Sequence, residues 1–272
     1  MNHKGKCALC RKEEELTFEH IPPRAAFNSS PAKPVSGDEI LGRDTVPWDL
    51  DGLHYYNQQK GMGKYSLCKS CNNNTGAWYA QDYIKFAQLI DHYFKLNNVE
   101  EHDTIIVKNI HPLRLIKQII SMFCSINTFE DERINPLREF VLNKNMKDLD
   151  KSKYRICCYF TKSHLIKYAP LTVIIEKCEG GFQYTTLSEI TAYPLGFILY
   201  FNPKESSNFQ GIDITNFSNY DYDDIKCLAF PKCIEEVNNI FPCDYRSKEE
   251  IIDCIKTSKK FIEENLGDDI TK

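Results

Sequence analysis

Cys7-Ala8-Leu9-Cys10 and Cys68-Lys69-Ser70-Cys71 decide the fold of the first part of this chain. A C-x-x-C turn aims both of its sulfurs at one point, and two such turns complete the tetrahedral site of a structural zinc ion. Fifty-seven residues separate the two pairs, so a bound ion closes a long loop and its binding energy becomes part of the folding energy. We therefore expect residues 5–80 to fold around zinc. The competing interpretations are two unrelated pairs or a redox dithiol.

The composition of the 272 residues is that of an ordinary globular protein, with 42% hydrophobic and 26% charged residues. The net charge is −4, with a balance of +1 over residues 1–80 and −5 over the remainder. This excludes a strongly basic protein but allows a local basic groove. No apolar run approaches the roughly 18 residues of a membrane helix, and the N-terminus has no signal-peptide pattern. We expect a cytoplasmic protein with no membrane partner, in which the other eight cysteines are reduced.

Two further motifs carry chemistry. Glu19-His20-Ile21-Pro22-Pro23 follows the first cysteine pair, and a carboxylate beside an imidazole suits a hard divalent cation and a general base, although such a pair alone is most often a surface feature. Asn72-Asn73-Asn74-Thr75-Gly76 follows the second pair, where the chain enters a helix. An Asn at that point either offers its amide oxygen to a metal ion or caps the helix, and capping is the more common role.

The order of the three features resembles the HNH endonuclease family, and within it the branch with four zinc-binding cysteines. The resemblance covers residues 5–80 and implies a ββα-metal module, in which zinc is structural and a separate Mg²⁺ or Mn²⁺ is catalytic. His20 matches the histidine that activates water, whereas Glu19 and Asn72 match ligands of the catalytic ion, with Asn73 or Asn74 as substitutes. The positions that match the zinc ligands are Cys7, Cys10, Cys68 and Cys71.

This sequence departs from the family pattern at one position. Many members carry an Asn about five residues before the second cysteine pair, which braces the loop around the catalytic histidine. Residues 61–67 contain no Asn, and the nearest candidates, His54 and Asn57, lie further back. His54 is kept as a candidate site residue because imidazole is a common ligand. His92 and His102 have no partner motif.

The resemblance implies a metal-dependent phosphodiesterase that acts on DNA, with RNA as the alternative substrate. Arg24 and Lys69 are close to the motifs in sequence and are candidates for phosphate contact. Two other classes stay open. One is a catalytically inactive zinc module that binds nucleic acid or protein, and the other is a thiol redox protein that uses both C-x-x-C pairs.

The rest of the chain predicts an α+β fold. We expect residues 1–97 to form the HNH-like module with a trailing aromatic helix, and residues 98–272 to form an α+β recognition or regulatory region. Apolar periodicity predicts helices over residues 78–94, 112–126 and 135–144, and Ser247 with Glu250 forms a capping box for a C-terminal helix. The composition of residues 28–45, rich in Ser, Pro, Gly and charged residues, predicts a loop. The expected strands cover residues 104–109, 154–160, 171–175, 182–186 and 196–201, the last four in an antiparallel sheet.

Residues 98–272 show no nucleotide loop, no nucleophile elbow and no second metal cluster. We therefore expect this region to position DNA, to bind a regulatory protein or a second copy of the chain, or to restrain the nuclease. Small HNH proteins with extra domains resemble components of bacterial defence systems, and for this chain that comparison is an analogy.

Overall fold

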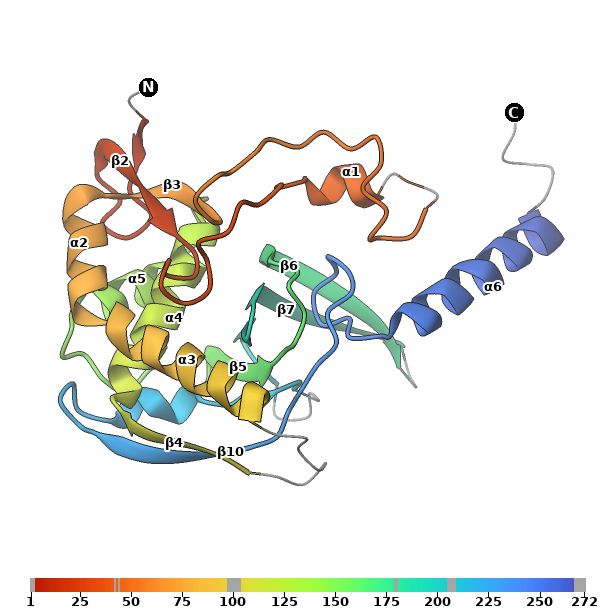
Figure 1. Ribbon diagram of the computed structural model, residues 1–272. Helices are drawn as coiled ribbons and strands as arrows, with labels where there is room; N and C mark the ends of the chain where they lie inside the picture. Colours follow the sequence, from red (N-terminus) through yellow and green to blue (C-terminus); the bar gives the residue numbers. More distant parts are fainter. Residues whose placement is uncertain are drawn as a thin grey trace.

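In the computed structural model, the N-terminal part of the chain forms an antiparallel sheet of three strands (Figure 1). These strands are β1 (Lys4–Lys6), β2 (Glu13–His20) and β3 (Gly63–Cys68). The structure describes residues 3–41, 43, 45–96, 104–178, 181–204 and 209–266. Strand β3 runs directly into helix α2 (Lys69–Trp78), and helix α3 (Ala80–Leu96) follows it. The predicted aromatic helix is therefore α3, and the preceding turns form a separate helix that starts at the second cysteine pair.

A long connection covers residues 21–62 between β2 and β3. The sequence predicted a loop over residues 28–45, but the short helix α1 (Gly37–Leu41) lies within it. Asp38 and Glu39 occupy its first turn, where carboxylates favour helix formation. Two segments of this connection are joined at Ala32 and Gln58, whose backbones exchange two hydrogen bonds of 2.9 Å.

Helix α4 (Pro112–Ile126) is the central element of the fold, and its residues are almost all buried. A helix that is apolar on most of its surface is expected to lie inside a protein, and proline in its first turn favours its start. Strand β4 (Thr104–Ile110) precedes it and helix α5 (Asn135–Leu142) follows it. All three elements lie where the sequence predicts them. Strand β4 also pairs with the distant β10 (Lys226–Pro231).

The larger sheet has the strand order β6-β7-β8-β5-β9, with antiparallel neighbours. This confirms the predicted α+β fold with an antiparallel sheet. Every residue of β8 is buried, because this strand lies inside the sheet and is covered on both faces. The strands and the 3₁₀ helix η1 that follows β9 have these bounds: β5 (Tyr154–Phe160), β6 (Lys167–Cys178), β7 (Gly181–Ala192), β8 (Leu195–Phe201), β9 (Ile212–Asp213) and η1 (Thr215–Asn219).

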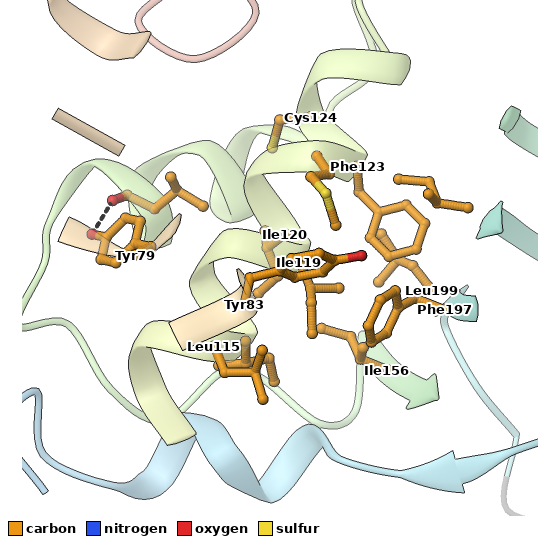
Figure 2. Packing of buried hydrophobic residues seen from close by; sticks show 14 of the residues in the cluster. Tyr79, Tyr83, Leu115, Ile119, Ile120, Phe123, Cys124, Ile156, Phe197 and Leu199 are labelled. Carbon is orange, nitrogen blue, oxygen red and sulfur yellow. Dashed lines mark hydrogen bonds between the residues drawn. The ribbon is translucent and has the colours of Figure 1, made fainter. Parts of the chain in front are cut away.

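One hydrophobic core contains residues from both halves of the chain (Figure 2). Tyr83 of α3 packs against Phe197 of β8, with ring centroids 5.9 Å apart. The buried Tyr79 hydroxyl donates a 2.7 Å hydrogen bond to the carbonyl of Val141 in α5, and Tyr168 of β6 donates to the carbonyl of Ile21. The predicted boundary between residues 97 and 98 lies outside the described residues, and the segments on either side of it share this core.

Helix α6 (Lys248–Leu266) projects from the rest of the molecule (Figure 1). The predicted capping box is confirmed, since Ser247 N–H donates to Glu250 Oε2 at 2.8 Å and Glu250 N–H donates to Ser247 Oγ at 3.2 Å. Ile251 is buried and Ile255 is half-buried, whereas the side chain of Phe261 lies outside the described residues. Among the described helices, none has the length and apolar character needed to cross a membrane.

Candidate metal centre and histidine site

The two C-x-x-C turns meet in the structure, as their spacing predicts. Their four ligand sulfurs all lie within 4.8 Å of one another, and the sulfurs of Cys10 and Cys68 are 3.9 Å apart. A tetrahedral zinc ion with bonds of about 2.3 Å holds its sulfurs about 3.8 Å apart. The donor set and its spacing therefore fit a metal ion such as zinc. The members of the cluster are Cys7, Cys10, Cys68 and Cys71.

The surroundings hold the first cysteine turn in place. Cys7 is fully buried, and its sulfur accepts a 3.3 Å hydrogen bond from the Cys68 backbone N–H. Together with the Cys71 thiol, which is the largest cause, this contact lowers the pKa of Cys7 to about 4. The carbonyl of Ala8 accepts a 2.8 Å hydrogen bond from Nε of the buried Arg138. The cluster is therefore supported by α5 as well as by its own strands.

His20 is the last residue of β2 and is half-buried. Its Nε2 lies 2.9 Å from the carbonyl oxygen of Lys60, which can only accept a hydrogen bond. Nε2 therefore carries the proton, and in the neutral ring Nδ1 keeps a lone pair. The His20 ring also contacts the edge of Phe18, with centroids 5.0 Å apart. This is the geometry of an oriented base.

Glu19 lies on the other face of β2, because successive strand residues point to opposite sides. Only 6% of its surface is exposed, and its Oε2 accepts hydrogen bonds from Ser66 Oγ at 3.0 Å and from Ser125 Oγ of α4. Burial raises the pKa of Glu19 to about 7. Within the described part of the chain, Oε1 accepts no hydrogen bond. The carboxylate therefore faces α4 and does not lie beside the His20 imidazole.

Asn72 does not cap a helix. Helix α2 begins at Lys69 with Cys68 as its N-cap residue, so the capping interpretation is wrong and Asn72 lies within the helix. Its Nδ2 donates to Thr17 Oγ1 at 3.0 Å and to the Phe18 carbonyl at 3.4 Å. The amide is thereby fixed against β2, and its Oδ1 accepts no hydrogen bond from the residues that the structure describes.

The three predicted catalytic side chains are not joined to one another by hydrogen bonds in the described ranges. Asn72 is joined to the strand that carries Glu19 and His20, but no hydrogen bond among the described residues links the three side chains to each other. The substitutes Asn73 and Asn74 are exposed on α2.

The other predicted candidates are surface residues. Arg24 and Lys69 are exposed. His54 is 94% exposed; its Nδ1 lies 3.7 Å from Glu39, to which its backbone N–H also donates at 3.0 Å. His54 is thereby attached to α1, and in the described ranges nothing connects it to His20.

Asn28 braces the His20 loop and was not predicted. Its buried Nδ2 donates to the carbonyls of Pro22 and Met62, and its Oδ1 accepts from the Met62 N–H, each at 2.7 Å. The Met62 carbonyl also accepts a 3.1 Å bond from Ile21 N–H. Only glycine fits at position 61 beside Asn28, since Gly61 has φ of +91° and a Cβ there would lie 2.0 Å from the Asn28 carbonyl oxygen.

No family model, curated protein or solved structure matches this chain. The assignment of the site therefore depends on its own residues. Among the Cys, His, Asp and Glu side chains in the described ranges, the four cysteines are the group of three or more that lies close enough to share an ion.

Proposed function

We propose that this chain is a metal-dependent endonuclease of the HNH type, with His20 as the general base and zinc bound by the four cysteines. One observation carries the proposal. The cysteine cluster joins β1, β2, β3 and α2, and His20 stands at the end of β2 with Nε2 held by the Lys60 carbonyl. This leaves Nδ1 able to take a proton from a water molecule that attacks a phosphodiester.

A second, divalent cation is part of this proposal. Glu19 is held through Oε2 and keeps Oε1 available as a ligand. Asn72 is held through Nδ2 and keeps its one side-chain oxygen, Oδ1, available. Carboxylate and amide oxygens suit Mg²⁺ or Mn²⁺. When bound, such an ion neutralises the scissile phosphate and stabilises the leaving oxygen. The serine hydroxyls of Ser66 and Ser125 would hold the carboxylate in place.

The expected substrate is DNA, with RNA as the alternative. Arg24 and Lys69 are exposed cations on either side of the motif set, and we propose that they contact phosphate. Such contacts position the nucleic acid and carry no sequence information.

His20→Ala tests the general base. Plasmid DNA and defined DNA and RNA oligonucleotides are incubated with Mg²⁺, Mn²⁺ or no added cation, and cleavage is followed on gels. Loss of a general base should slow cleavage by about 10²–10⁴-fold. His54→Ala is the matched control, because it removes an exposed histidine from the same region and should retain activity. Wild-type cleavage by His20→Ala would falsify the role of His20.

A catalytically inactive zinc module that binds nucleic acid or protein is the second candidate. The burial of Glu19, which raises its pKa to about 7, favours it, because a carboxyl that holds its proton binds a cation poorly. Nucleic-acid binding without cleavage under any of the cations, by protein that contains zinc, would select this candidate over the nuclease.

A further inference from the structure

A row of aromatic rings joins the segment after His20 to the large sheet. Tyr193, in the turn between β7 and β8, is at its centre. Its ring centroid lies 5.5 Å from that of Phe27, 5.0 Å from that of His164 and 6.4 Å from that of Phe94. Phe27 is 40% exposed, His164 is exposed, and the other two are half-buried. We refer to Phe27, Phe94, His164 and Tyr193 as the aromatic band.

Cations lie at both ends of the aromatic band. Exposed Arg24 lines, with Phe27 and Ser29, a shallow hollow of about 400 Å³. At the other end, the ammonium nitrogen of exposed Lys162 lies 5.6 Å from the centroid of the Phe94 ring.

The carboxylate of Asp91, which contacts Tyr193 of the aromatic band, is already paired with a cation. Asp91 accepts a 2.8 Å hydrogen bond from the Tyr193 hydroxyl and forms a 2.8 Å ion pair with Lys95. The charge that Arg24 and Lys162 present to solvent is therefore positive.

Phe27 is held in an unfavourable state. Its φ is +62°, a left-handed conformation that is uncommon for any residue other than glycine and a genuine outlier for a bulky one. Phe27 is also 40% exposed to water. The next residue, Asn28, fixes this conformation through its bonds to Pro22 and Met62. Residues in sparsely populated backbone conformations cluster at active sites and ligand sites. Here the strained residue lies in the connection that begins directly after His20.

We propose that the aromatic band binds single-stranded nucleic acid, with Phe27 in the connection that follows His20, an inference that rests on the proposed nuclease function for its biological meaning. Exposed rings bind unpaired bases by stacking, and cations spaced along them bind the phosphates. A duplex hides the faces of its bases, so the aromatic band favours single strands. DNA and RNA share this chemistry. The band also assigns a substrate-binding role to Lys162, His164 and Tyr193 of the second half of the chain.

Binding is measured on the full chain carrying His20→Ala, so that cleavage does not interfere. Fluorescence anisotropy follows labelled oligo-dT and oligo-rU of about 20 nucleotides and a duplex of the same length. We expect the single strands to bind more tightly than the duplex, and the two single strands identify whether DNA or RNA is preferred. Adding Phe27→Gly, which relieves the backbone strain, or His164→Ala should weaken single-strand binding about tenfold.

Phe182→Ala and Tyr184→Ala are the matched controls. These rings are 65% and 59% exposed near the opposite end of β7, and their loss should leave binding unchanged. Lys162→Glu, at an exposed position, tests the phosphate contact without disturbing the core. Zinc content and thermal unfolding verify that each variant is folded.

Two results would overturn the inference: a duplex that binds as tightly as the single strands, or binding that survives Phe27→Gly, His164→Ala and Lys162→Glu alike. The proposed nuclease is tested separately. If single strands bind through the aromatic band but the wild-type chain never cleaves, the nuclease proposal fails and the aromatic-band proposal stands. If the chain cleaves and none of the three variants changes cleavage, the nuclease proposal stands and the aromatic-band proposal fails.

Discussion

Asn28 and Met62 are joined through both ends of one side-chain amide, because Nδ2 donates to the Met62 carbonyl and Oδ1 accepts from the Met62 N–H. Two residues before Met62, the carbonyl of Lys60 holds Nε2 of His20. The side chain of Asn28 thus ties the end of β2 to the segment that enters β3. Asn28 therefore helps to fix the carbonyl that orients the His20 ring.

Asn28→Ala should therefore lower cleavage mainly through kcat. The variant leaves the Pro22 and Met62 backbone groups without their partner, which should destabilise the protein by about 1–3 kcal/mol and loosen the carbonyl that orients His20. Cleavage kinetics at several pH values check this, because a misoriented base changes the pH profile whereas a simple loss of folded protein does not.

Asn127→Ala is the control for Asn28→Ala. Asn127 is also buried and makes three comparable bonds, to the Phe123 carbonyl, Ser188 Oγ and the Leu171 N–H, but it lies at the end of α4. It should lose similar stability and keep its kcat. Equal losses of kcat in both variants would show that Asn28 acts only on stability.

Removal of the proposed zinc ion should unfold the N-terminal region. Binding of structural zinc contributes on the order of 10 kcal/mol to the folding of small zinc modules, so a chelator or Cys68→Ser should lower Tm sharply. Metal analysis of freshly purified protein should give about one zinc per chain. Cys227→Ser removes an exposed cysteine and should change neither quantity. Metal-free protein in which all twelve cysteines titrate as thiols would contradict the zinc site and favour a redox function instead.

Two buried serines, one turn apart in α4, can be compared to measure how much the hydrogen bond to Glu19 contributes to stability. Ser125 donates to the Glu19 carboxylate, whereas the buried hydroxyl of Ser121 has no partner among the described residues. Ser125→Ala should lower the free energy of unfolding by about 1–3 kcal/mol, and Ser121→Ala should leave it unchanged or raise it. Urea unfolding measures both, and equal effects would show that the Glu19 contact contributes nothing.

Lys117 makes the stability of the protein depend on pH. Its ammonium group is buried in α4, donates to the carbonyls of Phe140 and Asn143, and lies 3.9 Å from the Phe140 ring centroid. Burial lowers its pKa from 10.5 to about 7. The unfolded chain therefore binds this proton more tightly, so stability should rise with pH between about 7 and 10.5.

Lys117→Met should remove that rise, which is at most about 5 kcal/mol and smaller to the extent that the two carbonyls stabilise the charged form. Urea unfolding at pH 7 and pH 10 measures the difference for each protein. Lys108→Met, on the exposed side of β4, serves as the control. A slope that persists in Lys117→Met would place its origin in another group.

Local signals in the sequence predicted the elements that depend on local interactions. Helix α4 has proline in its first turn and a continuous apolar surface, and α6 begins with the Ser247–Glu250 capping box. The convergence of the cysteines followed from turn geometry and spacing. The pairing of β4 with β10 was not predictable in this way, because it joins segments more than a hundred residues apart.

The candidate site was predictable only in part, because it too depends on contacts between segments that are distant in the sequence. Alternation along β2 places Glu19 and His20 on opposite faces, but only the position of α4 decides that the Glu19 side is the buried one. The role of Asn28 depends on carbonyl groups of Pro22 and Met62 that no sequence pattern brings together. The start of α2 was misplaced because the helix uses Cys68, a residue of the cysteine cluster, as its N-cap.

The bond between Arg138 and Ala8 limits how this protein can be dissected. A fragment that ends at Leu96 would lose Arg138 from the first cysteine turn, Ser125 from Glu19 and the partners that bury Tyr83. The apolar surface of α3 that is then exposed should cause such a fragment to aggregate into inclusion bodies even when zinc is supplied. Grafting the first hundred residues onto another protein should fail for the same reason.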